Sequence, residues 1–305
     1  MTEVVDVVVV GSLNHDIVAG VDVAPGPGET VLARTLTRTN GGKGGNQAAA
    51  AARAGARVRM VSSVGVDAEG DMQVDNLTGY GVDVAGIARQ ADLRTSLALI
   101  WVTPDGENSI IVTPGAKDRV TPDLVRADVA GLDGVKVVLA QSEVGAAVSD
   151  ASADVARELG SRFVLSCGPV VLPSPATLRL CDPVIVNVTE ARDLLGQVGA
   201  DATVPEASLA DELLTATGAR SVIVTLGARG SLLAQVGGSS VTLPAAKAEK
   251  VVDTTGAGDT YCGVVAARLA LGDSLEDACQ QAAVAGAAAV GWLGARPAVT
   301  RPSST

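Results

Sequence analysis

The 305-residue sequence contains very few aromatic side chains and a single histidine. Phe, Trp and Tyr together make up 2% of the chain, whereas hydrophobic residues make up 47%. The core must therefore be built from Ala, Val and Leu, which favours thin, closely packed layers. With His15 as the only histidine, there is too little material for a histidine-based triad or a multi-histidine metal site. The length allows one large α/β domain or two domains.

Cysteine is also scarce, and positive charge is outnumbered. The four cysteines show no CxxC spacing and lie among apolar or Ala-rich residues. This setting predicts buried free thiols rather than disulfides or a metal site. The chain has 23 Lys and Arg against 34 Asp and Glu, a formal net charge of −11. This balance argues against a nucleic-acid surface, but it is compatible with a small anionic substrate if positive potential is concentrated locally.

Long hydrophobic runs are missing too. No apolar stretch reaches membrane length without glycine or charge, and no charged segment followed by an apolar one opens the chain. We therefore expect a soluble, cytoplasmic protein.

The most informative stretch is Val-Val-Asp-Thr-Thr-Gly-Ala-Gly-Asp-Thr at residues 251–260. The apolar-rich segment after it predicts a helix up to Leu271, so the glycines lie at a helix N-terminus. Backbone N–H groups and the helix dipole make this an anion site, and Gly256 and Gly258 permit close approach. Asp259 would repel a phosphate there, unless it takes the proton from a hydroxyl that attacks the phosphate. A plain glycine turn with an Asp that favours the dipole is the alternative.

Strand and helix patterns alternate along most of the chain. Residues 4–10 are a β-branched run typical of a strand buried on both faces. Further strand-like runs cover residues 58–64, 135–140, 163–166, 184–187, 221–226, 231–236 and 241–243. Helical patterns cover residues 72–79, 145–159, 190–195, 206–217 and 275–290. The alternation predicts an α/β fold, a doubly wound, mostly parallel sheet flanked by helices.

Two segments break this rhythm. Residues 31–40 alternate imperfectly between apolar and polar side chains, and residues 95–102 and 108–113 flank a Pro-Asp-Gly turn. The second pair is typical of a hairpin. We interpret both segments as strands of a small accessory sheet inserted into the main domain.

Polar side chains follow several of the main strands, at the edge where open α/β sheets bind ligands. They are Asn14, Asp16, Glu143, Asn187, Glu190 and the segment 225–230. Each has a local alternative, such as turn chemistry for Asn14 and Asp16 and a capping box for Asn187 with Glu190.

A second glycine-rich segment, Asn-Gly-Gly-Lys-Gly-Gly-Asn-Gln at residues 40–47, opens an Ala-rich helix that Gly55 ends. It is not a Walker A loop, because no Lys-Ser/Thr pair closes it. Lys43 and Asn46 could hold a polyhydroxy ligand, and a flexible turn with a solvated Lys is the alternative. A nicotinamide dehydrogenase is excluded because no Gly-x-Gly-x-x-Gly follows the first strand.

Together these motifs resemble the ribokinase-like (PfkB) family of sugar and nucleoside kinases. Residues 41–48 meet its amino-side signature and residues 253–260 its carboxyl-side signature, while residues 11–16 and 27–30 match in order and spacing. The resemblance spans nearly the whole chain. Gly45 stands where the nearest members usually have Ala.

The resemblance implies a role for each matching position. Asp259 would be the base that deprotonates the acceptor CH2OH, beside an anion hole formed by Gly256, Ala257 and Gly258. The sugar hydroxyls would be held by Asn14, Asp16, Gly42, Lys43, Asn46 and Glu143. ATP would be bound by Asn187, Thr225, Gly227, Arg229 and Gly230. Mg²⁺ would be placed by Glu190, and an activating K⁺ by Asp253, Thr255 and the loop around Gly294.

The resemblance also implies the domain organisation. Residues 1–12, 41–94 and 114–305 would form the α/β core, and residues 13–40 and 95–113 a β-sheet lid. A homodimer joined through the lids is expected.

The first functional hypothesis is ATP-dependent phosphorylation of the primary hydroxyl of D-ribose, giving ribose 5-phosphate. A kinase of another sugar or of a nucleoside is the alternative within this class. A phosphate-bearing substrate is disfavoured, because only Arg34 and Arg38 lie near the lid strands. A non-catalytic sugar- or nucleotide-binding protein is a second class, and Asp259 argues against it because a binding module needs no base.

Overall fold

A computed structural model describes residues 4–104 and 107–296, and its main element is a large, mostly parallel sheet. The strand order is β13-β12-β11-β10-β9-β8-β1-β4-β5, parallel from β5 to β11 with β12 and β13 antiparallel at one edge. The strands are β1 Val7–Val10, β4 Val58–Gly65, β5 Ile87–Gln90, β8 Val137–Gln141, β9 Arg162–Ser166, β10 Cys181–Asn187, β11 Ser221–Thr225, β12 Ser231–Gln235 and β13 Val241–Leu243. Both β4 and β8 flank β1, so the strand order reverses there, and a ligand crevice is expected at the carboxyl ends of these strands.

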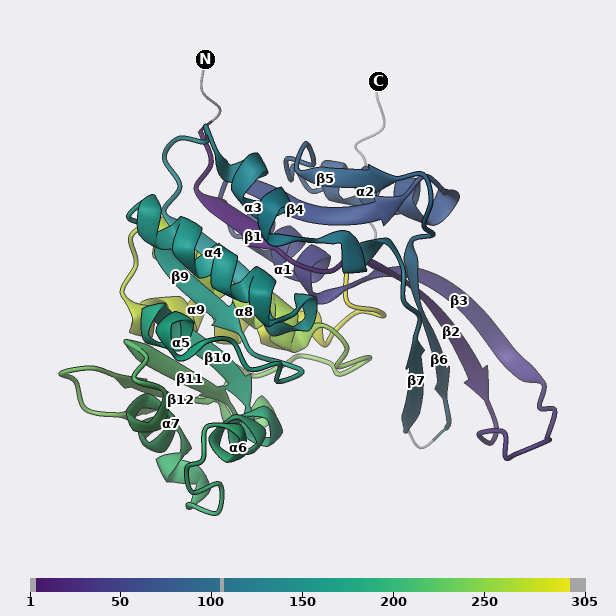
Figure 1. Cartoon of the computed structure of the whole chain (residues 1–305). Coiled ribbons are helices and arrows are strands. Elements are labelled where there is room, and N and C mark those ends of the chain that lie inside the picture. Colours follow the sequence, from purple (N-terminus) through teal and green to yellow (C-terminus); the bar gives the residue numbers. More distant parts are fainter. Residues whose placement is uncertain (1–3, 105–106, 297–305) are drawn as a thin grey trace.

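Helices cover both faces of this sheet (Figure 1). One face packs against α1 Lys43–Arg53, α2 Ala68–Gly79, α8 Ala257–Ala270 and α9 Leu275–Ala289. The other packs against α3 Pro122–Val129, α4 Ala146–Glu158, α5 Pro175–Leu180, α6 Val188–Gln197 and α7 Leu209–Thr217. Short 3₁₀ turns are η1 Ala116–Arg119, η2 Ser142–Val144, η3 Glu206–Ser208 and η4 Gly227–Arg229.

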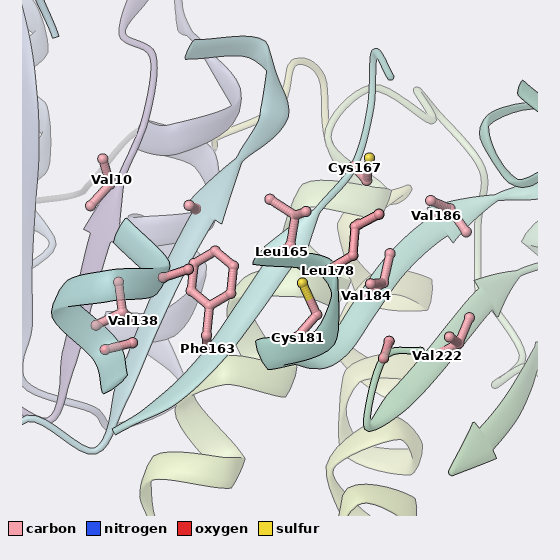
Figure 2. Close-up of a cluster of buried hydrophobic side chains, with 14 of the residues drawn as sticks. Val10, Val138, Phe163, Leu165, Cys167, Leu178, Cys181, Val184, Val186 and Val222 are labelled. Carbon is pink, nitrogen blue, oxygen red and sulfur yellow. The ribbon is translucent and has the colours of Figure 1, made fainter. Parts of the chain in front are cut away.

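The valine run of β1 explains the two-layered core. Val8 and Val10 point into one apolar cluster, while Val7 and Val9 point into the other. Figure 2 shows the first cluster, in which Phe163 packs among Val, Leu and Cys side chains. Because aromatics are rare, small residues bring the layers close, and buried side chains fill both faces of the sheet.

A second, four-stranded sheet projects from this body (Figure 1). It consists of β3 Ala33–Gly41, β2 Asn14–Val21, β6 Ser96–Val102 and β7 Asn108–Val112, in that order. The outer pairs are antiparallel, and β2 runs parallel to β6. We call it the lid sheet. The strands β2 and β3 lie between β1 and α1 in the chain, whereas β6 and β7 lie between β5 and η1.

The fold class predicted from the sequence is confirmed. All four cysteines are buried free thiols, as expected. Among the described residues, none of the helices has both the length and the apolar character needed to cross a membrane.

Local differences from the sequence predictions have physical reasons. Asn14 and Asp16 lie in β2 rather than in a turn, since pairing with β3 and β6 extends the chain there. The strand β5 and the short helices α3 and α5 were not predicted. The helix α2 begins at Ala68, ahead of the expected residue 72, because the Asp67 side chain caps it. The division into core and lid at the expected boundaries stays a prediction, and residues 1–3, 105–106 and 297–305 lie outside the described residues.

Candidate active site

A cavity of about 160 Å³ lies at the carboxyl edge of the main sheet and contains residues from both glycine-rich motifs. Lys43 comes from the start of α1, and Gly256, Gly258 and Asp259 come from the start of α8. The other lining residues lie in β9, β10 and β11 or on the helices α6 and α8, and they are Ser166, Ile185, Val186, Asn187, Glu190, Thr225 and Cys262. Segments more than 200 residues apart in the sequence therefore share one site.

Amide side chains of α1 hold the Asp259 carboxylate. Asn46 donates its Nδ2–H to Oδ2 at 2.8 Å, and Gln47 donates its Nε2–H to Oδ1 at 3.1 Å. Gln47 is fully buried, donates also to Ser166 Oγ at 3.2 Å, and accepts from Gln141 Nε2 at 2.8 Å. Because both of its oxygens accept hydrogen bonds, the Asp259 carboxylate has a fixed orientation and does not rotate freely.

The N-terminus of α8 is shaped by Gly256. This residue has φ of 77°, in the left-handed region that favours glycine, and it has no side chain to cap the helix. A Cβ at this position would lie 2.6 Å from Cα of Ala295. The first turn therefore offers backbone N–H groups and the positive end of the helix dipole to an anion in the cavity.

Lys43 supplies positive charge to this acidic environment. Burial alone would lower the pKa of Lys43, but the carboxylates of Asp259, Glu143 and Glu190 outweigh it, so the pKa lies above its ordinary value. The ammonium group therefore stays protonated and can neutralise charge on a ligand.

Asp16 lies in β2, beside the end of the paired strand β3. Its carboxylate is 2.2 Å from the position that a Cβ on Gly41 would occupy, so only glycine fits beneath it. Burial raises the pKa of Asp16 to about 6; Arg296 opposes the shift, and Glu143 and Asp259 add to it.

Glu143, in the turn after β8, reaches the same region. It forms an ion pair with Lys117 from η1, with 3.3 Å between Oε1 and Nζ, and both side chains are largely buried. No sequence motif connects Lys117 with the site.

Several buried oxygen atoms around this region have no hydrogen-bond partner among the described residues. They are Ser12 Oγ, Asn14 Oδ1, Asn40 Oδ1, Asn46 Oδ1 and Gln141 Oε1. Unpaired buried acceptors are costly, and a ligand rich in hydroxyl groups would satisfy them. The predicted sugar-contacting residues are thus brought together from β2, the start of α1 and η2.

Asn187 and Glu190 form the capping box that their spacing indicated. The Asn187 N–H donates to Glu190 Oε2 at 2.8 Å, and the Glu190 N–H donates to Asn187 Oδ1 at 2.9 Å. Burial raises the pKa of Glu190, against the effects of the Asn187 N–H and of Lys43. Both residues line the cavity, so the structural role and a ligand-binding role are compatible.

The segment after β11 is only partly in the cavity. Thr225 lines it, and the η4 turn of Gly227 to Gly230 follows. Arg229 lies on the surface, where its Nη2 donates to Glu206 Oε2 at 2.9 Å. Its assignment to the nucleotide stays a prediction, as do those of Gly227 and Gly230.

Asp253, Thr255 and Gly294 are brought together as expected for one site. Asp253 accepts from the Thr255 N–H at 2.9 Å and from the Gly294 N–H at 2.8 Å. Burial raises the pKa of Asp253, but these hydrogen bonds outweigh it and hold the pKa below its ordinary value. Ala295, next in the chain, packs on Gly256, so this loop touches the N-terminus of α8.

Sequence reasoning assigned no specific role to five contributors. Gln47 lies inside the amino-side motif, and its place beside Asn46 was the only available signal. The others come from segments without a motif at that position, and they are Lys117, Gln141, Ser166 and Arg296. A larger hollow of about 290 Å³ lies between α1, α8 and α9, but none of the predicted site residues lines it.

Comparison with known proteins agrees with this geometry. The profile of the pfkB family of carbohydrate kinases matches residues 5–301. The chain is 34% identical over 222 residues to a ribokinase of Haemophilus influenzae, covering 73% of this chain and 72% of that one. A solved ribokinase structure from Thermotoga maritima superposes with a TM-score of 0.85 at 30% identity, covering 97% of both chains. A ribokinase of Arabidopsis thaliana, solved in complex with ribose and ATP, superposes with a TM-score of 0.83 at 30% identity, covering 96% of this chain and 95% of that one. The chain belongs to the pfkB family of carbohydrate kinases.

Proposed function

We propose that the protein is an ATP-dependent kinase that transfers the γ-phosphoryl group to the primary hydroxyl of D-ribose, giving ribose 5-phosphate. One observation carries this proposal. The Asp259 carboxylate is fixed by two amides at a helix N-terminus, inside a cavity that also holds Lys43 and Glu190. The similarity to ribokinases over most of the chain supports ribose as the acceptor.

Asp259 is the base in this reaction. It takes the proton of the acceptor CH2OH as that oxygen attacks the γ-phosphorus, while the bond to the β-phosphate oxygen breaks and ADP leaves. Backbone N–H groups of Gly256, Ala257 and Gly258 stabilise the charge on the transferring group. Asn46 and Gln47 keep the carboxylate in position for this proton transfer.

The sugar lies between the lid sheet and the start of α1. The oxygens of Asn14, Asp16 and Glu143 accept from the ribose hydroxyls, and the Lys43 ammonium donates to them. A site that bonds each hydroxyl rejects analogues that lack one, because its own buried groups are then left unpaired.

Mg²⁺ accompanies ATP in this proposal. Among the described residues no cluster of three or more His, Cys, Asp or Glu could hold a metal. Mg²⁺ keeps several waters and is usually bound through one or two carboxylates together with the substrate phosphates. Glu190 is the carboxylate of the cavity that would hold it through water, and the bound ion would neutralise charge on the phosphates. The Thr225 and Asn187 edge of the cavity lies beside the nucleotide.

A monovalent cation such as K⁺ would bind beside Asp253 and Thr255 near Gly294. The Asp253 carboxylate is held ionised there by two backbone N–H groups, which favours a nearby cation. Since Ala295 packs on Gly256, the cation would order the N-terminus of α8.

The lid sheet would close over the sugar and also join two copies of the chain. By the strand register, Asp16, Val18 and Ile110 share one face, and Ile17 and Ile111 share the other. Ile110 and Ile111 are both about half exposed, at 53% and 50%. The face with Asp16 covers the sugar, and the opposite face meets the lid of a second copy.

One panel tests the function. Purified protein with MgATP is offered ribose, deoxyribose, fructose, adenosine and other nucleosides, and ADP and product formation are followed. Ribose should give the highest kcat/KM, and Asp259→Asn should lower kcat by about 10²–10⁴-fold. Asp154→Asn, which removes a half-exposed carboxylate that does not line the cavity, should leave kcat unchanged. A preference for a nucleoside would overturn ribose as the substrate, and an unimpaired Asp259→Asn would overturn the mechanism.

The dimer is tested by light scattering with size-exclusion chromatography. The wild type should run as a dimer and Ile111→Asp as a monomer, because a buried unpaired carboxylate at the interface is costly. Val236→Asp places the same charge at a 71% exposed valine outside the lid sheet and should remain dimeric. A monomeric wild type at micromolar concentration would refute the lid interface.

A further inference from the structure

Arg296 is a buried cation that the reaction described above does not use. Its residue exposure is 8%, and burial lowers its pKa to about 10, against the effects of Tyr80, Asp16 and Asp259. Among the described residues, it forms no ion pair within 4.0 Å, and its Nε and Nη1 have no hydrogen-bond partner. Burying a guanidinium without an ion pair costs free energy of folding, so we expect Arg296 to have a role beyond packing.

The hydrogen bonds of Arg296 lead to the two junctions between the core and the lid sheet. Nη2 donates to the carbonyl oxygen of Gly41 at 2.8 Å and to Gln73 Oε1 at 2.7 Å. The fully buried Gln73 in turn donates to the carbonyl oxygen of Asn14. Gly41 ends β3 and Asn14 begins β2, and the two are paired across the sheet.

These junctions bear directly on the sugar site. The Asp16 carboxylate lies against Cα of Gly41, and Asn14 and Gly42 are in close contact, since a Cβ on Gly42 would be 2.7 Å from the Asn14 N atom. A shift of the Gly41 carbonyl would therefore move Asp16, Asn14 and the start of α1 together.

Gly45 makes room for this arginine. It lies in the first turns of α1, and a Cβ there would be 2.8 Å from Arg296 Nη1 and 3.1 Å from its Cζ. It would also lie 2.6 Å from Leu13 Cδ2. The glycine that departs from the usual Ala is thus a helical position that faces a guanidinium.

We propose that Arg296 is a positioning residue for the sugar site, which holds both lid junctions through Gly41 and Gln73 and depends on glycine at position 45. The inference rests on the proposed function, because its readout is the binding of the sugar acceptor. Loss of the guanidinium leaves the Gly41 carbonyl and Gln73 Oε1 without their donor, which weakens sugar binding and leaves the ATP side intact.

The arginine also acts on Asp16 through charge. The charged groups that influence Asp16 are Arg296, Glu143 and Asp259, and of these Arg296 alone favours the ionised form. Removing its charge therefore raises the pKa of Asp16, whereas replacing it with another cation does not.

The experiment compares Arg296→Gln, Arg296→Lys, Gly45→Ala and the double variant Gly45→Ala/Arg296→Gln. Arg296→Gln should raise the KM for ribose about tenfold or more, with kcat and the KM for ATP within about threefold. The acid limb of kcat/KM for ribose should also move to higher pH, and Arg296→Lys should restore the wild-type limb. Arg53→Gln is the matched control, because Arg53 stacks on Trp292 of the same loop, 5.0 Å from the ring centroid, and touches neither junction.

The combination of substitutions at positions 45 and 296 gives the most discriminating test. Gly45→Ala alone should raise the KM for ribose, and adding Arg296→Gln should cause less than the sum of the two effects, because the shorter side chain leaves space for the methyl group. Additive effects, equal changes in the KM for ribose and ATP, or an unmoved acid limb would each overturn the proposal. Thermal melts with and without ribose show that each variant is folded, and Arg296→Lys keeps the test available if a neutral variant does not fold. If the wild type prefers another sugar, the proposed function fails, and the same variants are assayed with that sugar.

Discussion

Replacing Asp16 with Asn should stabilise the protein at neutral pH and impair it as an enzyme. The carboxylate is partly buried against Gly41, and burial raises its pKa from the ordinary 3.8 to about 6. A raised carboxyl pKa means that ionisation is harder in the folded state than in the unfolded state. The stability contribution of the protonated form is thus complete below pH 3.8 and is lost as the pH rises through 6.

The size of the effect follows from the two pKa values. A shift from 3.8 to about 6 corresponds to about 3 kcal/mol of lost stability at pH 8, since one unit corresponds to about 1.4 kcal/mol. At pH 5, where only the unfolded state is largely ionised, the loss is about 1.5 kcal/mol. Asn resembles the protonated carboxyl group, so Asp16→Asn should be more stable than the wild type by about these amounts.

Urea denaturation of both proteins at pH 5 and pH 8 measures this difference. The free energy of unfolding of Asp16→Asn should exceed that of the wild type at both values, with a gap about 1.4 kcal/mol larger at pH 8. A variant that is less stable at pH 8, or a gap that does not change with pH, would refute the assigned environment of Asp16. The wild type should show an acid limb in kcat/KM for ribose near pH 6, and the same variant should lower kcat/KM and remove this limb.

Four further variants, one of them a control, probe other contacts. Gln47→Leu removes a donor to Asp259 and should lower kcat about 10²-fold with little change in either KM, measured by steady-state kinetics; an unchanged kcat would contradict its positioning role. Gly263→Ala places a Cβ 2.2 Å from the Gln47 carbonyl oxygen, between α1 and α8, and should destabilise by about 1–3 kcal/mol in urea. Gly286→Ala, whose Cβ would meet no atom closer than 3.6 Å, is the control and should be neutral or stabilising. Asp253→Asn should reduce the ratio of kcat in KCl to kcat in choline chloride towards one, and a full K⁺ response would remove Asp253 from the cation site.

The sequence predicted the main sheet well because local and global signals agree there. The valine run of β1 is apolar at every position, and the structure buries each of Val7 to Val10 completely. The short helix α5 gave no such signal, since its six residues offer less than two turns of periodicity. At the polar start of β2, turn chemistry remained the local alternative for Asn14 and Asp16, because these residues are paired only through contacts distant in sequence.

The residues of the candidate site also divide into those that a local sequence signal predicted and those that only distant contacts reveal. Motif residues such as Lys43 and Asp259 were found because their neighbours in sequence are distinctive, and the cavity brings them together. Lys117 and Arg296 were missed because neither lies in a motif, and only the fold carries them to Glu143 and to Gly41. Position 45 shows this limit of sequence reasoning most clearly. The contact that requires glycine there is with the Arg296 guanidinium, 251 residues further along the chain.

The charges of the site explain how an acidic chain can handle a triphosphate. Lys117 is paired with Glu143, and Arg296 donates to the carbonyl oxygen of Gly41, so neither cation is available to the nucleotide. Arg229 lies outside the cavity in its pair with Glu206. Lys43 is therefore the cation that faces the reacting groups within the described cavity, and three carboxylates keep it protonated. Under the proposed function, the remaining charge of the phosphates would be met by the first turn of α8 and by a divalent ion that arrives with the nucleotide. Within that turn, Gly256 is the position that cannot carry a side chain, because its φ is 77° and a Cβ would lie 2.6 Å from Cα of Ala295.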